Sequence, residues 1–390
     1  MSRSLIAVSM LTLALAACQT PAPSTHAPPA PVAATPGLQD TAFARLSARY
    51  LDEGLALSPV SATQIGDHRF DAELDDLSAA GRQAAADWSR AMLAELDALD
   101  TARLSRENQV DALILRNQLR GSLWDLETMQ GWAWDPQVYS GLAGGAIYNL
   151  MARDFAPMPQ RLMAASARME KIPRLLAQAR ANLDPARVPR THAETVARQN
   201  KGLLSLVDGF ITPNAASLTG ADRARLDASI ATLRKAVDEH QAWLDGTLVP
   251  NARGEFRIGA RRYDEKLRFS LNASLTRAEI RTRAVDELAR VRQDMYAVAR
   301  TVLADRPGAP ALPATPSEAQ RQAAIEAALD LANRDKPGRD EVVDYAKYTL
   351  AEATRFVRAR DLVTVPDDPV KIILMPEFQR GVAVAYCDSP

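Results

Sequence analysis

Residues 276–304, TRAEIRTRAVDELARVRQDMYAVARTVLA, contain the pattern that decides the fold. Thr276 followed by Glu279 is the capping-box signature of a helix N-terminus. Apolar residues then recur at steps of three and four: Ile280, Ala284, Leu288, Val291, Met295, Val298 and Val302. This spacing places one continuous apolar stripe on one face of a helix. The segment therefore predicts a long amphipathic helix.

The same spacing recurs in most of the chain after residue 40. A second capping box, Ser317 with Gln320, precedes Ile325 and Leu329. Further stripes run through 226–244 and 343–357, and prolines fall between the runs, at 185, 189, 213, 250, 307–316 and 337. The fold class that we predict is mainly α: a large helical bundle joined by short linkers.

Two β-prone runs stand close to the C-terminus. They are Val370–Met375 (VKIILM) and Gly381–Tyr386 (GVAVAY), separated by Pro376 to Arg380. The stretch from Phe256 to Phe269 is a candidate for one more strand. We therefore expect a few short C-terminal β-strands beside the helices.

The N-terminus has the pattern of an export signal. Arg3 precedes an 11-residue apolar stretch, Leu5 to Leu15, which is too short to span a bilayer. Leu15-Ala16-Ala17-Cys18 matches the lipobox of bacterial lipoproteins, whose cysteine becomes the lipidated N-terminus. An ordinary signal peptide with an incidental cysteine is the alternative.

These features divide the chain into three parts. We expect a signal peptide at 1–17, a disordered proline-rich tether at 18–39 and a helical domain at 40–390. Gln19 after the cysteine favours the outer over the inner membrane. The predicted location is the cell envelope, with a lipid anchor at Cys18 in the outer membrane and the protein facing the periplasm.

Composition excludes several classes of protein. The chain has 390 residues, with 47 Lys and Arg against 48 Asp and Glu, so its net charge of −1 argues against a nucleic-acid partner. Two cysteines rule out a disulfide scaffold, and four scattered histidines form no local zinc motif. No phosphate-binding loop and no GxSxG elbow occurs. The residues therefore predict no cofactor and no metal ligand.

Three histidines outside the tether are candidate site residues. His68 stands between Asp67 and Arg69 after Gly66, which suggests either a base with an orienting carboxylate or a cluster that fixes a loop. His240 occupies a stripe position and is expected to pack in the core. His192 stands near the start of a predicted helix.

An aromatic cluster lies in the middle of the chain. Trp132 and Trp134, with Trp124, Tyr139 and Tyr148 nearby, surround three glycines at 141, 144 and 145. Such a segment is either a glycine-rich loop that lines a groove for a peptide or sugar, or a turn packed by its own aromatic residues. Arg153 and Asp154 follow, and are expected to end a helix with an ion pair.

Several segments together resemble a large bacterial family, the domain of unknown function 885. They are Leu57–Thr63, Gly66–Arg69, Arg153–Phe155, His192–Thr195 and above all Met375–Phe378 and Gly381–Pro390. The resemblance covers roughly residues 40–390. Many members are exported lipoproteins, and the family is regarded as zincin-like and peptidase-like.

The resemblance implies a zinc site that this sequence does not contain. Family members carry a His-Glu-x-x-Pro-Gly-His motif after a Cys-Asp-Ser-Pro-like stretch, whereas this sequence ends at Pro390. No metal-binding residue is carried over, and zinc is expected only with a C-terminal segment that is missing here. The implied architecture is an incomplete zincin-like fold.

The expected function follows from both lines of reasoning. The chain is interpreted as the N-terminal portion of a lipid-anchored, zinc-peptidase-like protein that is not catalytic by itself. The alternative is a non-catalytic periplasmic helical binding or scaffold lipoprotein. The expected partners are the membrane, through the lipid anchor, and a peptide substrate. The expected groove-lining residues are Asp67, His68, Arg69, Trp132, Trp134, Arg153, Asp154 and Tyr386.

Overall fold

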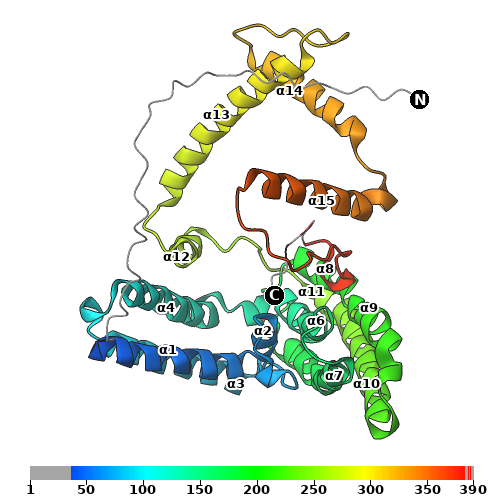
Figure 1. The fold of residues 1–390 in the computed structure, drawn as a ribbon. Helices are drawn as coiled ribbons and strands as arrows, with labels where there is room; N and C mark the ends of the chain where they lie inside the picture. The colour runs from blue at the N-terminus through cyan, green and yellow to red at the C-terminus, as the bar shows by residue number, and fades with distance from the viewer. Residues whose placement is uncertain (1–36, 383–384, 386, 388–390) are drawn as a thin grey trace, which may run out of the picture. The chain divides into compact units, whose positions relative to one another are not determined.

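The computed structural model describes residues 37–382 together with 385 and 387 (Figure 1). These residues are mainly helical, which confirms the predicted fold class. The signal peptide, the lipidation site Cys18, nearly all of the tether and Tyr386 lie outside the described residues. Three separate apolar cores organise the helices that are described.

The first core joins the N-terminal helices α1 (Leu38–Leu57), α3 (Ala79–Ala98) and α4 (Arg106–Trp124). Ser78 and Ser105 start α3 and α4, because each side chain accepts a backbone N–H bond from the third residue on. Short elements connect these helices: α2 (Pro59–Gln64), η1 (His68–Phe70) and η2 (Thr101–Arg103). Met92 and Leu96 are completely buried in this core.

The second and largest core lies between α6 (Gln137–Met151), α7 (Met158–Asn182) and α10 (Gly220–Trp243). It also takes in the shorter helices α8 (Arg190–Gln199), α9 (Gly202–Leu206) and α11 (Val249–Asn251), and α5 (Gly131–Trp134) contacts α6 and α7. The π-helical turns η3 (Asp125–Met129), η4 (Val207–Ile211) and η6 (Leu244–Leu248), with the 3₁₀ turn η5 (Thr212–Ser217), extend α4, α9 and α10. His240 is 3% exposed in this core, as the stripe position predicted.

The third core is small and belongs to α13 (Arg277–Leu303) and α14 (Glu318–Ala332). Both predicted capping boxes are present, at Thr276 with Glu279 and at Ser317 with Gln320. Further elements flank this pair, namely α12 (Ala260–Leu271), η7 (Asn333–Asp335), η8 (Arg339–Glu341) and α15 (Val342–Arg360). Neither α12 nor α15 contains a buried residue.

The prediction of C-terminal strands is wrong for the residues that the structure describes. Val370–Met375 has no regular secondary structure, and Val370, Ile373 and Leu374 are exposed, with Leu374 at 71%. A β-prone run forms a strand only where a neighbour satisfies its backbone groups, and none is present within 37–382. Most of the region 256–269 is helical instead, from the start of α12 at Ala260. The second run, Gly381–Tyr386, is only partly described.

The predicted glycine-rich loop is also wrong, because Gly141, Gly144 and Gly145 lie inside α6. Two of these glycines allow close packing. A Cβ at position 144 would stand 2.2 Å from the ring of Phe378, and a Cβ at 145 would stand 3.2 Å from Val60. Their signal in the sequence is therefore that of a crowded helix rather than of a turn.

Phe378 anchors the C-terminal segment to the second core. It belongs to the short 3₁₀ turn η9 (Glu377–Gln379) and is 4% exposed. Gly202 at the start of α9 admits the backbone of this turn, since a Cβ there would lie 2.7 Å from the Phe378 nitrogen. Two polar bonds hold the segment: Ser205 Oγ donates to Glu377 at 2.8 Å, and Gln199 Nε2 donates to the Arg380 carbonyl at 2.6 Å.

Candidate functional site

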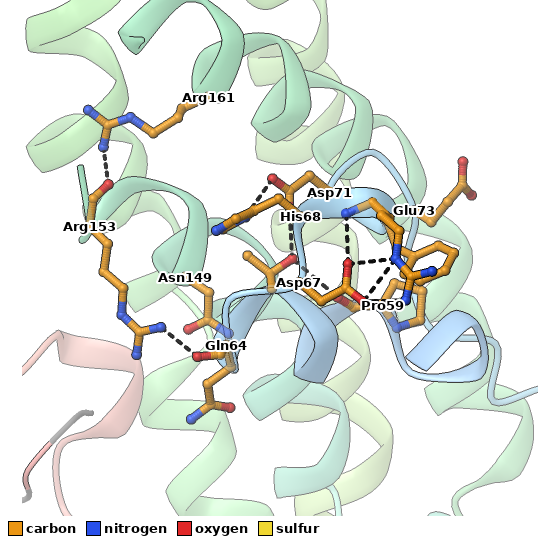
Figure 2. A network of polar contacts seen from close by, with 12 residues as sticks. Pro59, Gln64, Asp67, His68, Asp71, Glu73, Asn149, Arg153 and Arg161 are labelled. Carbon is orange, nitrogen blue, oxygen red and sulfur yellow. Dashed lines mark hydrogen bonds and ion pairs between the residues drawn. The ribbon is translucent and has the colours of Figure 1, made fainter. Parts of the chain in front are cut away.

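Polar contacts around His68 and just after α6 involve five of the predicted site residues, of which Figure 2 labels Asp67, His68 and Arg153. Three elements supply this network: the turn η1 that follows α2, the C-terminal end of α6 and the first half of α7. Ser58-Pro59 starts α2, with proline in the first turn, where its missing N–H costs nothing. Gly66, with φ of +91°, then reverses the chain into η1.

His68 is paired with Asp71 and not with its neighbour Asp67. The His68 Nδ1 atom lies 3.0 Å from Asp71 Oδ2, across the i,i+3 spacing of the turn. One face of the imidazole stacks on Phe155, with ring centroids 3.5 Å apart. A carboxylate and an aromatic ring thus fix the orientation of a partly exposed imidazole.

The pair continues inward to a completely buried arginine. Thr63 Oγ1 donates to Asp71 Oδ1 at 2.6 Å and accepts from Arg168 Nη2 at 2.6 Å. Arg168 also donates to the carbonyls of Pro59, Phe70, Glu73 and Ala146. Burial lowers the pKa of Arg168 to about 10, so the guanidinium still carries its charge at neutral pH. Five acceptors from three chain segments therefore converge on one cation.

Asp67 has a local structural role. Its carboxylate accepts hydrogen bonds from the backbone N–H and the guanidinium of Arg69. The bond from the backbone N–H makes Asp67 the N-cap of η1. The Arg69 guanidinium holds the pKa of Asp67 below its usual range. Arg69 also pairs with Asp52 of α1 at 2.9 Å. This arrangement matches the interpretation of a cluster that fixes a loop.

Arg153 and Asp154 lie just after α6, on the side of His68 that Phe155 covers. Arg153 Nη1 donates to the Gln64 carbonyl at the end of α2 (Figure 2). Asp154 accepts from Arg161 at 3.0 Å and from Lys371 at 2.9 Å, and Lys371 is the first cause of its lowered pKa. The network therefore ties α2, α6 and α7 to the C-terminal segment.

Trp132 and Trp134 are placed elsewhere, in the short helix α5 that follows η3. Their indole nitrogens donate to the carbonyls of Leu126 and Met129, at 3.0 and 2.8 Å. The Arg82 guanidinium lies 3.7 Å from the ring of Trp132. Both side chains are engaged with their own surroundings, which favours the interpretation of a self-packed turn.

The other two histidines belong to separate surroundings. His192 Nδ1 lies 3.3 Å from Asp135, and its ring packs near Trp134. His240 stacks on Trp243, and burial lowers its pKa to about 4. Neither histidine joins the network around His68.

Sequence reasoning missed Asp71, Thr63 and Arg168. A weak signal exists for each. His68 and Asp71 have the i,i+3 spacing of side chains that meet on one turn. Arg168 stands within the apolar stripe of α7, between Ala165 and Ile172, where a charge is expected only if it is fully bonded.

In a pair such as His68 and Asp71, the carboxylate orients the imidazole that would act as a general base.

The described residues were also compared with the requirements of a zinc site. Among residues 37–382, no group of three or more His, Cys, Asp or Glu side chains is arranged to hold a metal ion. His68 and His192 each have a single carboxylate partner, and His240 lies in the apolar core. These residues do not fit the zinc site that the resemblance implies.

The comparisons identify the family. Residues 59–390 match the model of a bacterial protein family of unknown function, DUF885. The chain belongs to this family. The predicted resemblance is thereby confirmed, whereas its zincin-like aspect stays a prediction. A search of curated proteins finds no match.

A solved structure supports the fold of this DUF885 member. It is described as that of a putative lipoprotein of unknown function from Shewanella oneidensis. The two chains share 27% sequence identity with a TM-score of 0.65, over 83% of this chain. The match covers 59% of the neighbour, so this chain spans less than two thirds of that protein's length.

The lipoprotein description of the neighbour agrees with a place in the cell envelope. Within the described part of the chain, no helix has both the length and the apolar character needed to cross a bilayer. Membrane attachment of the DUF885 member through Cys18 remains a prediction from the sequence.

Proposed function

We propose that this DUF885 protein is a lipoprotein of the outer membrane, facing the periplasm, whose helical body binds extended polypeptide. The lipobox that ends at Cys18 and the following Gln19 support the anchor and its membrane. The lipoprotein description of the Shewanella neighbour adds to this support. The peptide is the substrate class that the family resemblance implies.

The observation that carries the binding role is the way in which the body holds its own residues 375–380. This segment contains one 3₁₀ turn, Glu377–Gln379, and is secured by one buried aromatic anchor, Phe378. A buried amide, that of Gln199, donates to its backbone, and a serine of α9 donates to its carboxylate. An anchor in a pocket together with bonds to the main chain is the usual chemistry of peptide recognition.

Hydrolysis is assigned to no residue among those described. Asp71 orients the His68 imidazole as it would orient a base. The buried cation of the network, Arg168, donates to backbone carbonyls. We therefore derive no catalytic step from it. In this proposal, no zinc-binding or peptidase role is assigned to the residues that the structure describes.

The test uses the mature protein purified from membranes in detergent. We expect capped neutral peptides to bind, measured by isothermal titration calorimetry, and to stay intact by mass spectrometry after a long incubation. Metal analysis should find well under one zinc per chain. Failure of all peptides to bind would refute the binding role, and cleavage with one zinc per chain would refute the non-catalytic assignment.

A further inference from the structure

A pocket of about 270 Å³ opens beside the anchored C-terminal segment. Its walls come from α6 (Gln137, Ser140, Gly141), from Gln199 of α8 and from the segment itself (Phe378, Gln379, Val382). It is separate from the His68 network and from Trp132 and Trp134. The same helices that hold Phe378 thus also shape an open cavity next to it.

Among the described residues that line this pocket, none is charged. A charged ligand would lose its hydration without gaining a counter-charge, so the chemistry favours a neutral one. Phe378, Val382 and the bare backbone of Gly141 supply an apolar surface. The polar groups are amides and one hydroxyl.

Two of these amides have hydrogen-bonding capacity left over. Gln199 is 5% exposed, and its Nε2 donates to the Arg380 carbonyl, so its Oε1 is left as an acceptor. The side-chain amide of Gln137 bonds to no residue in the described part of the chain, so it offers both a donor and an acceptor. Gln137 is half-buried, and a donor–acceptor pair is complementary to a peptide group, which has one N–H and one C=O.

Gly141 makes the backbone of α6 accessible at this point. A Cβ built there meets nothing within 4 Å. At Gly144, one turn away, the ring of Phe378 occupies the corresponding space. A ligand can therefore approach the helix closely at Gly141. The volume is slightly below the ~300 Å³ at which pockets for small ligands begin. It suits one peptide group with one apolar side chain.

We propose that this pocket is a subsite for a neutral peptide unit, which takes one apolar side chain against Phe378 and bonds the adjoining peptide group through Gln137 and Gln199. This inference rests on the proposed peptide-binding function and adds the place and the specificity. It excludes acidic and basic side chains at the bound position.

The test compares acetyl-Ala-Leu-Ala-Ala-amide with the same peptide carrying Asp or Lys in place of Leu, on the mature protein in detergent. We expect the Leu peptide to bind at least tenfold more tightly than the other two. Gly141→Leu fills the pocket and Gln137→Leu removes the free amide, and each should weaken binding of the Leu peptide at least tenfold. The control is Gly246→Leu in η6, where a Cβ also meets nothing within 4 Å, away from the pocket.

The outcomes separate this inference from the proposed function. If the Leu peptide binds but Gly141→Leu and Gln137→Leu leave its affinity unchanged, the subsite is wrong while peptide binding stands. Equal binding of the three peptides also overturns the subsite. If none of the peptides binds the unmodified protein, the proposed function itself fails. Thermal melting of each variant identifies any that fails to fold, and Gln137→Leu, a milder change than Gly141→Leu, then decides.

Discussion

Gly144→Ala is expected to release the C-terminal segment, although alanine is the better helix former. The added Cβ would stand 2.2 Å from two ring carbons of Phe378, which no real contact allows. Because α6 is rigid and buried at this point, the phenylalanine has to leave its pocket. The segment from Pro376 to Arg380 then loses its only aromatic anchor.

The magnitude follows from the loss of the buried phenylalanine. Exposing a buried Phe side chain costs about 1.5–3 kcal/mol. The higher helix propensity of alanine stabilises α6 equally in the docked and undocked states, so it does not change the docking equilibrium. Docking of the segment should therefore weaken by about 1.5–3 kcal/mol, which is roughly a 10- to 150-fold rise in the undocked fraction.

Limited trypsin proteolysis measures this fraction at Arg380, whose carbonyl Gln199 holds in the docked state. Cleavage follows the open population when opening is fast compared with cutting. We expect cleavage after Arg380, detected by intact mass, to accelerate by roughly 10- to 150-fold in Gly144→Ala. In Gly141→Ala the new Cβ meets nothing, so the rate should be unchanged.

A double variant provides the decisive comparison. Phe378→Ala alone should accelerate cleavage as Gly144→Ala does, and adding Gly144→Ala to it should change little, because the clash has been removed. The reasoning is refuted if Gly144→Ala behaves like Gly141→Ala, or if the effects of the two substitutions simply add.

Three further predictions concern the buried Arg168, the core histidine His240 and the lipid anchor at Cys18. Arg168→Met should lower the free energy of unfolding by about 3–5 kcal/mol, because it leaves several buried carbonyls without a donor. The control, Arg223→Met on the surface, should lower it by under ~0.5 kcal/mol. Urea denaturation measures both. The pKa of His240 is about 4 in the folded protein and near 6.5 in the unfolded chain. As the pH falls from 6.5 to 4, the unfolded chain therefore protonates at His240 before the folded protein does. The free energy of unfolding should fall by about 3 kcal/mol over that range. Denaturation of His240→Leu across that range should lack this loss, and an equal loss would contradict the assignment. Mass spectrometry of the membrane fraction should find an acylated Cys18 at the mature N-terminus, whereas an intact Met1 or an unmodified soluble Cys18 would rule out the anchor.

Helices could be predicted from the sequence because their signals are local. The capping boxes at Thr276 and Ser317 and the stripe position of His240 each depend on neighbours within a few turns. A strand depends on a partner from elsewhere. Val370–Met375 has the composition of a strand, but within 37–382 no strand lies beside it.

The candidate site could be predicted only in part, for the same reason. His68, Arg153 and Asp154 were singled out, but the pairing of His68 with Asp71 rather than Asp67 depends on the backbone direction in η1. Glycine signals were ambiguous, because the residue serves turns and close helix packing equally. Contacts with Phe378, more than 200 residues away, settle that choice for Gly144.

The three separate apolar cores have a consequence for how the protein loses its structure. A single core makes a domain melt in one cooperative step, whereas cores that share few contacts open independently. The α13–α14 pair buries only five apolar residues, and it should open well before the core around α7 and α10. Heating is therefore expected to give successive calorimetric transitions, and hydrogen exchange should grade the amides into groups of distinct protection. No single melting temperature would then describe this chain.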